Sequence, residues 1–124
     1  MIKKISIILL LLFCTSTYAI EKKINFSIED FENAKANGKT IVINSFEAWC
    51  GTCVAQSKIL NNAKKEFKDI IFMTYEHEKN KEIANKLNIE FRTTIVVYKG
   101  NKEVSRLIGQ TAKKIIYKAI QEGI

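Results

Sequence analysis

The chain has 124 residues, a length that fits one domain. Hydrophobic residues make up 47% of it and charged residues 27%, an ordinary globular composition that argues against a disordered or fibrous protein. The formal net charge is +7, but the lysines are interspersed with Glu and Asn. A nucleic-acid-binding surface would need a basic stripe with aromatic platforms. We therefore expect a solvated basic surface and no nucleic-acid partner.

The first residues have the three-part layout of a secretory signal peptide. Lys3 and Lys4 give a positive start, residues 5–13 form an almost unbroken apolar run, and residues 17–19 read Thr-Tyr-Ala, a small-x-small cleavage site. The apolar run is about half of the roughly 20 residues that a membrane-spanning helix needs. We expect a cleaved signal peptide rather than a membrane anchor.

Cleavage after Ala19 makes residues 1–19 the signal peptide and residues 20–124 an exported, periplasmic domain with no stable membrane insertion. Cys14 raises a lipoprotein alternative, but the preceding residue is a bulky Phe where a lipobox has a small side chain. The exported domain would keep only Cys50 and Cys53, here called the cysteine pair. In an oxidising compartment such a pair is either disulfide-bonded or kept reduced by an electron donor.

Helices alternate with buried strands along the rest of the chain, which predicts an α/β fold with a mixed sheet covered on both faces. The signals are helical and strand periodicity, a Ser N-cap with an acid three residues later, and glycines that end elements. In chain order they predict a helix from Ser27 to Gly38, a strand Thr40–Phe46, a helix of about four turns opened by the cysteine pair, a strand Ile70–Tyr75, a helix Lys81–Leu87, a strand Thr93–Tyr98, a strand Glu103–Ile108 and a helix Thr111–Ile120, with a further short strand near Ile24–Phe26. Val54 and Ile115 are among the apolar residues expected to face the core.

The position of the cysteine pair predicts redox chemistry. Cys50 directly precedes the second helix, where unpaired backbone N–H groups and the helix dipole stabilise a thiolate. In such pairs the thiol pKa falls from about 8.5 to as low as about 3.5–7.5. Gly51 leaves Cys50 accessible, and Cys53 lies one turn further on. We predict that Cys50 is the nucleophile that attacks a substrate disulfide and that Cys53 resolves the mixed disulfide.

Other functions of the cysteine pair have less support in the sequence. A structural disulfide across so short a loop would stabilise the domain by only about 2 kcal/mol. A closed zinc site needs four ligands. Residues 20–124 offer two cysteines and the lone His77, which we interpret as a solvent-facing loop residue. A two-thiolate copper(I) site remains as the alternative function. An interaction module without turnover is a third.

The strand, the motif Trp49-Cys50-Gly51-Thr52-Cys53 and the following helix together resemble the thioredoxin family. A second region, LNIEFRTTIVVYKGNKEVSRLIGQ (residues 87–110), is similar to the family's strand hairpin that ends in a glycine, here Gly109. The resemblance implies the thioredoxin fold and a thiol:disulfide oxidoreductase, which in exported members acts on envelope proteins. It also makes Gly51, Thr52 and Trp49 neighbours of the active site, with Trp49 shaping the substrate surface or alternatively packing in the core.

The chain departs from the family at the loop that faces the pair. The family has a cis-proline there, but this sequence has no proline, and Thr93 stands at that position after Arg92. A cis bond before a non-proline residue costs roughly 2.5–4 kcal/mol, so we expect a trans peptide. We predict that Arg92 and Thr93 form the substrate-facing loop and that the Arg92 charge lowers the pKa of Cys50. The alternative is a solvent-exposed arginine.

The second departure is Asn44, where thioredoxins have a buried aspartate that assists proton transfer. Asparagine does not titrate, so it can hold a water or orient a group but cannot act as a base. Glu47 is close enough in sequence to assist instead, although a surface carboxylate is the simpler interpretation. We keep Asn44 and Glu47 as candidate proton-transfer assistants.

These inferences converge on an exported thiol:disulfide oxidoreductase, with the reductase direction favoured because Trp49 and Gly51 look most like thioredoxin itself. The expected partners are proteins with disulfides or dithiols and one redox donor or acceptor. No metal and no cofactor is expected, because the dithiol itself carries the two electrons.

Overall fold

The computed structural model describes residues 26–124. The predicted signal peptide of residues 1–19, with its cleavage site and Cys14, lies outside the described residues. The strand expected near Ile24–Phe26 is outside them except for Phe26, which is not in a strand.

The order of helices and strands is the one predicted. The elements are α1 (Ile28–Ala36), β1 (Thr40–Phe46), α2 (Gly51–Glu66), β2 (Ile71–Glu76), α3 (Lys81–Lys86), β3 (Thr94–Lys99), β4 (Lys102–Ile108) and α4 (Lys113–Gln121). Their ends differ from the predicted ends by at most two residues, except where the caps were counted with the helix. The α/β class is therefore confirmed.

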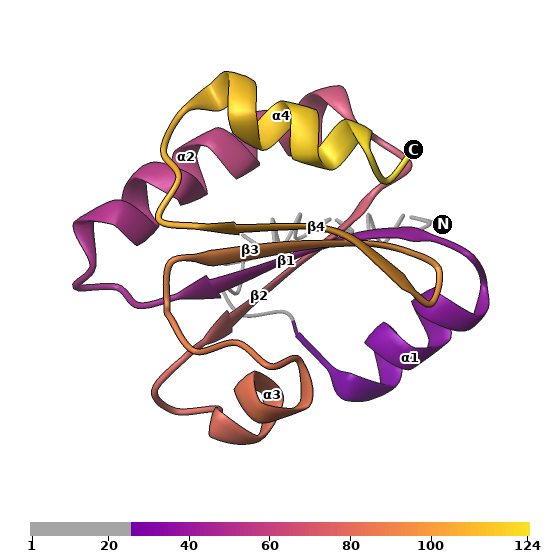
Figure 1. Ribbon diagram of the computed structural model, residues 1–124, viewed down its shortest axis with the longest axis horizontal. Coiled ribbons are helices and arrows are strands. Elements are labelled where there is room, and N and C mark those ends of the chain that lie inside the picture. Colours follow the sequence, from indigo (N-terminus) through magenta and orange to yellow (C-terminus); the bar gives the residue numbers. More distant parts are fainter. Residues whose placement is uncertain (1–25) are drawn as a thin grey trace, which may run out of the picture.

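Within residues 26–124, four strands form one mixed sheet in the order β2-β1-β3-β4 (Figure 1). β1 pairs parallel with β2, so that Ile41 lies opposite Ile71, and antiparallel with β3, so that Asn44 lies opposite Ile95. β3 and β4 form an antiparallel hairpin. The central strands of the sheet are β1 of the parallel pair and β3 of the hairpin. The end of β1 leads directly into the cysteine pair.

Alternate residues of β1 supply two hydrophobic cores, one on each face of the sheet. Ile41 and Ile43 point to the face covered by α1 and α3, where they pack with Phe31, Tyr75 and other apolar residues. Val42 points to the opposite face, where α2 and α4 pack (Figure 1). Because helices cover both faces, nearly all of β1 is buried.

Local sequence signals explain where α1 begins and ends. Ser27 caps the helix, and its hydroxyl accepts a hydrogen bond from the N–H of Asp30 at 3.3 Å. Asn37 is the C-cap and Gly38 follows with φ +67°, a left-handed conformation that favours glycine. Both predictions for this helix are confirmed.

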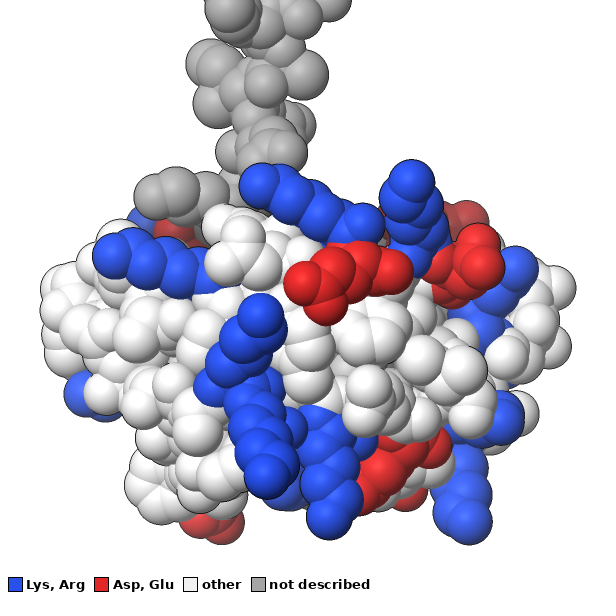
Figure 2. All heavy atoms as spheres, turned by 90° about the horizontal axis from the view of Figure 1, so that it is seen from above, with Lys and Arg blue, Asp and Glu red and all other residues white. Residues whose placement is uncertain are grey.

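Two predicted core residues are in fact exposed. Val54 on α2 is 37% exposed and Ile115 on α4 is 43% exposed, because each lies on the outer flank of its helix. Lysines are spread over the face formed by α2 and α4, with acidic side chains between some of them (Figure 2). Within residues 26–124, no helix has the length and apolar character needed to span a membrane.

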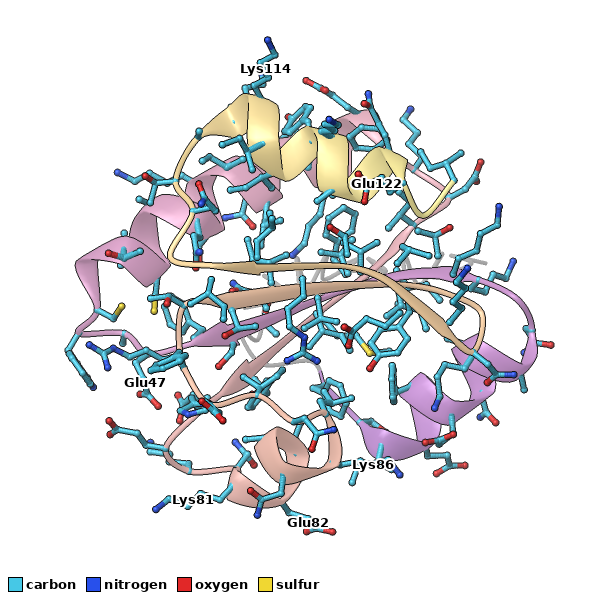
Figure 3. The ribbon with its side chains drawn as sticks, viewed as in Figure 1. Glu47, Lys81, Glu82, Lys86, Lys114 and Glu122 are labelled. Carbon is cyan, nitrogen blue, oxygen red and sulfur yellow. The ribbon has the colours of Figure 1, made fainter. Side chains whose placement is uncertain are left out.

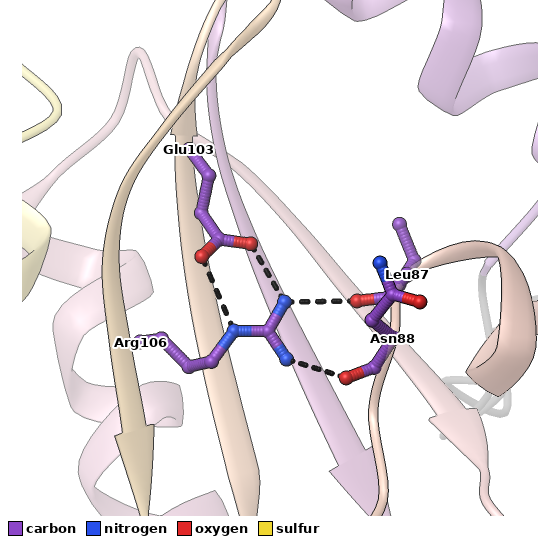
Figure 4. Close-up of polar contacts among 4 residues, drawn as sticks. All are labelled: Leu87, Asn88, Glu103 and Arg106. Atoms are coloured by element: carbon purple, nitrogen blue, oxygen red, sulfur yellow. Dashed lines mark hydrogen bonds and ion pairs between the residues drawn. The ribbon is translucent and has the colours of Figure 1, made fainter.

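Arg106 on β4 holds the end of α3 in place (Figure 4). Its guanidinium donates to the backbone oxygens of Leu87 at 2.8 Å and Asn88 at 2.9 Å, and it also pairs with the Glu103 carboxylate at 2.6 Å. Asn88 has φ +52°, the reversal that ends the helix. The segment that Arg106 anchors runs directly into the loop at Arg92, so β4 helps to position that loop.

Candidate active site

Cys50 is the N-cap of α2, as predicted. Its sulfur accepts a hydrogen bond from the N–H of Cys53 at 3.2 Å, which satisfies one of the free donors of the first turn. Both cysteines are buried, and both are free thiols in this structure. A carbon placed on Gly51 as a Cβ would meet nothing within 4 Å, so the first turn of the helix is open at this point.

The two thiols differ in acidity. Burial raises the pKa of Cys50, but hydrogen bonds from Cys53 and then from Arg92 outweigh it, so this pKa lies below its ordinary value. Burial raises the pKa of Cys53 to about 11, with a further rise from the hydrogen bond and the charge of Cys50. At neutral pH the site therefore holds one activated sulfur and one protonated thiol.

Arg92 stacks on Trp49 beside the cysteine pair. The guanidinium carbon lies 4.3 Å from the centroid of the indole ring, a cation–π contact. Trp49 is 62% exposed, which excludes the core-packing alternative and leaves its ring on the surface next to Cys50. Arg92 is partly buried and lies within reach of the Cys50 sulfur, so it is not the free loop arginine of the alternative interpretation.

The loop of Arg92 and Thr93 lies against the pair, as expected. No peptide bond in the described part of the chain is cis, so the bond between these residues is trans. The Cys53 thiol donates to the backbone oxygen of Arg92 at 3.4 Å. The backbone oxygen of Thr93 accepts from the N–H of Gly109 at 3.0 Å. The sequence thus placed this loop correctly without the proline of the family.

Glu47 is not a surface carboxylate. It is 6% exposed, and its carboxylate accepts a hydrogen bond from the N–H of Glu78 at 2.6 Å. Figure 3 shows it at the end of the sheet where α2 begins. Its backbone oxygen also accepts from the N–H of Cys50 at 3.2 Å. Glu47 therefore joins the turn before the cysteine pair to the turn after β2, and its role in proton transfer stays a prediction.

Asn44 is buried on the α2 side of β1, with 2% exposure, and its side-chain oxygen has no hydrogen-bond partner within residues 26–124. It borders a cavity of about 20 Å³ that is also lined by polar side chains of α2, among them Ser57 and Asn61. A water needs about 10–15 Å³ and two to four polar partners. The cavity fits the expectation that Asn44 holds a water. Thr52 lies in the first turn of α2 and does not line this cavity.

His77 corrects another expectation. It lies in the turn after β2, but its ring is not free in solvent. Its Nδ1 lies 3.0 Å from the Ser45 hydroxyl and 3.3 Å from the Tyr75 hydroxyl, and both of these residues are fully buried. This cluster of three side chains lies on the face of the sheet opposite Asn44. In the part of the chain that the structure describes, no three His, Cys, Asp or Glu side chains gather in a way that could hold a metal.

Sequence reasoning missed Gln56. This residue is on α2, one turn after Cys53, and its side chain is completely buried. Its amide nitrogen donates to the backbone oxygens of Thr93 at 2.9 Å and Gln110 at 3.0 Å. The only available signal was a glutamine in the apolar stripe of a helix, which periodicity alone reads as an exception.

Comparison with known proteins agrees with this geometry. The family description "Thioredoxin" matches residues 22–122. The chain belongs to the thioredoxin family. The members of this family are thiol:disulfide oxidoreductases that act on protein disulfides, so the predicted family, fold and enzyme class are confirmed.

Individual relatives match over most of the thioredoxin domain. The chain is 33% identical to a thioredoxin of Mycoplasma genitalium over 91 residues, which are 73% of this chain and 89% of that protein. It is 29% identical to an H-type thioredoxin of Fagopyrum esculentum over 90 residues, 73% of this chain and 78% of that protein. The crystal structure of the Fasciola hepatica thioredoxin superposes with a TM-score of 0.69 at 27% identity, covering 77% of this chain and 90% of that one.

Proposed function

We propose that this thioredoxin-family chain is an exported oxidoreductase whose WCGTC dithiol exchanges disulfides with exported proteins, in the reductase direction. The observation that carries the proposal is the difference between the two sulfurs. The pKa of Cys50 is lowered by hydrogen bonds from Cys53 and Arg92 despite burial, whereas burial raises that of Cys53 to about 11. Such a pair has one thiol that is activated as a nucleophile and a second, protonated thiol that can resolve the mixed disulfide.

In the first step the Cys50 thiolate attacks one sulfur of a substrate disulfide. A bond forms between Cys50 and that sulfur, the substrate S–S bond breaks, and the second substrate sulfur leaves as a thiolate that takes a proton from solvent. The open position at Gly51 and the exposed ring of Trp49 border the approach to Cys50.

In the second step Cys53 attacks Cys50 and releases the substrate. Cys53 first loses its proton to solvent. Its sulfur then bonds to the Cys50 sulfur as the bond between Cys50 and the substrate breaks, and the substrate sulfur leaves as a thiolate that takes up a proton from solvent. Part of the rise in the pKa of Cys53 comes from the hydrogen bond and charge of Cys50, and that part disappears once Cys50 is in the neutral mixed disulfide. The step ends with a Cys50–Cys53 disulfide and a reduced substrate, so two electrons have moved from the protein to the substrate.

Export and direction rest on different support. Export is supported by the signal-peptide layout of residues 1–19. The reductase direction is supported by the thioredoxin-like motif and relatives. The lowered pKa of Cys50 acts the other way, because it stabilises the reduced form and makes the protein a stronger oxidant. The equilibrium reduction potential decides: about −270 mV indicates a reductant and about −120 mV an oxidant.

Trapping tests the exchange mechanism. Cys53→Ser leaves Cys50 to attack but removes the resolving thiol, so we expect a stable mixed disulfide with a disulfide-bonded test protein such as insulin. Cys50→Ser is the matched control and should trap nothing. If neither variant traps and the wild-type protein reduces no disulfide, the exchange mechanism is wrong and the copper(I) alternative, which would use the same two thiolates, becomes the hypothesis to test with copper(I) itself.

A further inference from the structure

We infer that Gln56 is a positioning residue that holds the Arg92–Thr93 loop against the cysteine pair through the whole exchange cycle. The inference rests on the proposed function and names a residue that the family motif does not include. Gln56 is on the same helix as both cysteines, three residues after Cys53, and none of its surface is exposed.

The amide of Gln56 joins α2 to both ends of the β3–β4 hairpin. One hydrogen bond, of 2.9 Å, goes to the oxygen of Thr93, directly before β3, and the other, of 3.0 Å, goes to the oxygen of Gln110, shortly after β4. Thr93 and Gly109 are themselves joined by a backbone hydrogen bond of 3.0 Å. One buried side chain thus fixes two chain segments that meet beside the cysteines.

The loop depends on such contacts because its sequence does not stiffen it. Proline would restrict the backbone at position 93, but threonine does not, and the peptide bond before it is trans. The thiol of Cys53 provides a second contact from α2, to the oxygen of Arg92 at 3.4 Å. A third contact, from Thr94 to Phe91 at 2.7 Å, is local to the loop and does not reach α2.

Only one of the two contacts from α2 survives oxidation. When Cys50 and Cys53 form a disulfide, Cys53 has no S–H and no longer donates to Arg92. The bonds of Gln56 involve no sulfur and persist in both redox states. Gln56 therefore keeps the Arg92 side chain near Cys50 when the disulfide is reduced again, and the loop is already in place when the next substrate binds.

The oxygen of the Gln56 side chain supports this interpretation. It has no hydrogen-bond partner within residues 26–124, although it is buried. Burial of an unpaired amide oxygen is unfavourable, and an apolar side chain would avoid it. The group that is used is the NH₂, which donates both bonds to the loops.

Gln56→Met and Gln56→Glu test the inference. Methionine has a similar length and no donor, so the loop should shift away from the pair. We expect the pKa of Cys50, measured from thiolate absorbance without any substrate, to rise, and kcat/KM for a protein disulfide to fall about tenfold or more, since small misplacements at a reacting centre are costly. Ala63→Gly is the matched control, because it weakens the buried side of the same helix without touching the loop.

Gln56→Glu adds a pH-dependent measurement that separates hydrogen bonding to the loop from a contribution to core packing alone. A protonated carboxyl has one O–H donor and can restore one bond, whereas the buried carboxylate has none. The activity of this variant relative to wild type should therefore rise as the pH falls. An unchanged pKa of Cys50 in Gln56→Met, or an equal change in Ala63→Gly, would overturn the inference. Neither outcome depends on whether the wild-type protein reduces disulfides, because the pKa of Cys50 is measured on the protein alone.

Discussion

The guanidinium of Arg92 lies over the indole ring of Trp49, with 4.3 Å between the guanidinium carbon and the ring centroid. The two residues come from opposite sides of the cysteine pair, one before α2 and the other before β3. The stack orients Arg92 so that its charge and a hydrogen bond act on Cys50. A surface aromatic residue thereby contributes to the acidity of a buried thiol.

Arg92→Ala should raise the pKa of Cys50, because both interactions of the guanidinium favour the thiolate. A less stable thiolate makes the reduced form less stable, so the reduction potential should become more negative. Alkylation of Cys50 as a function of pH and equilibration with glutathione measure the two effects. Arg92→Lys keeps the charge without the planar stack, so its Cys50 pKa and reduction potential should lie between those of the wild-type protein and Arg92→Ala. A Cys50 titration that is the same in all three proteins would contradict the role of Arg92.

The contribution of the cysteine pair to the stability of the reduced protein should pass through a maximum near pH 9. Cys50 has a lowered pKa in the fold, so its contribution increases as the pH rises toward 9.0, the ordinary value of the thiol. The pKa of Cys53 is raised to about 11, chiefly by burial, so its contribution is complete below 9.0 and is lost as the pH rises through 11. Urea unfolding at a series of pH values measures this. The loss above pH 9 should be smaller in Cys53→Ser, which lacks the thiol whose pKa is raised to about 11.

Arg106→Ala should lower the free energy of unfolding by about 1–3 kcal/mol, because the backbone oxygens of Leu87 and Asn88 lose charged donors. Glu103→Gln is the matched control. It weakens an ion pair that is partly exposed and should cost less than about 1 kcal/mol. Equal losses in the two variants, measured by urea unfolding, would show that the salt bridge rather than the backbone contacts is important.

Asn44→Asp should be destabilised in a pH-dependent way. The new carboxyl would be buried where the Asn44 oxygen has no partner, so burial would raise its pKa and penalise the charged form. The loss relative to wild type should be small below about pH 4 and reach about 1–4 kcal/mol at neutral pH. Asn61→Asp introduces the same charge at an exposed position that borders the same cavity and should show little of this effect. A pH-independent difference for Asn44→Asp would show that burial does not raise the pKa of the new carboxyl.

Much of the fold follows from local sequence. The Ser27 cap and the left-handed Gly38 set the ends of α1 without reference to the rest of the chain. The apolar run of Thr40–Phe46 predicted β1 with its actual bounds, because a strand buried on both faces must be apolar almost throughout. Helix exteriors were harder, and Val54 and Ile115 show that an apolar residue at helical spacing is not always buried.

The redox role of the cysteine pair was predicted from the sequence alone, because Cys50 and Cys53 are neighbours on one helix whose N–H groups stabilise the thiolate. The contribution of Arg92 to that thiolate depends on the fold. The surroundings of the pair were decided by tertiary structure. Glu47 bonds to Glu78, His77 to Ser45, and Gln56 to Thr93 and Gln110, and each bond joins residues at least 31 positions apart. Periodicity relates only residues within one helix or strand. It can show that a polar side chain lies on the buried face, but it cannot predict which distant group will form a hydrogen bond with that side chain.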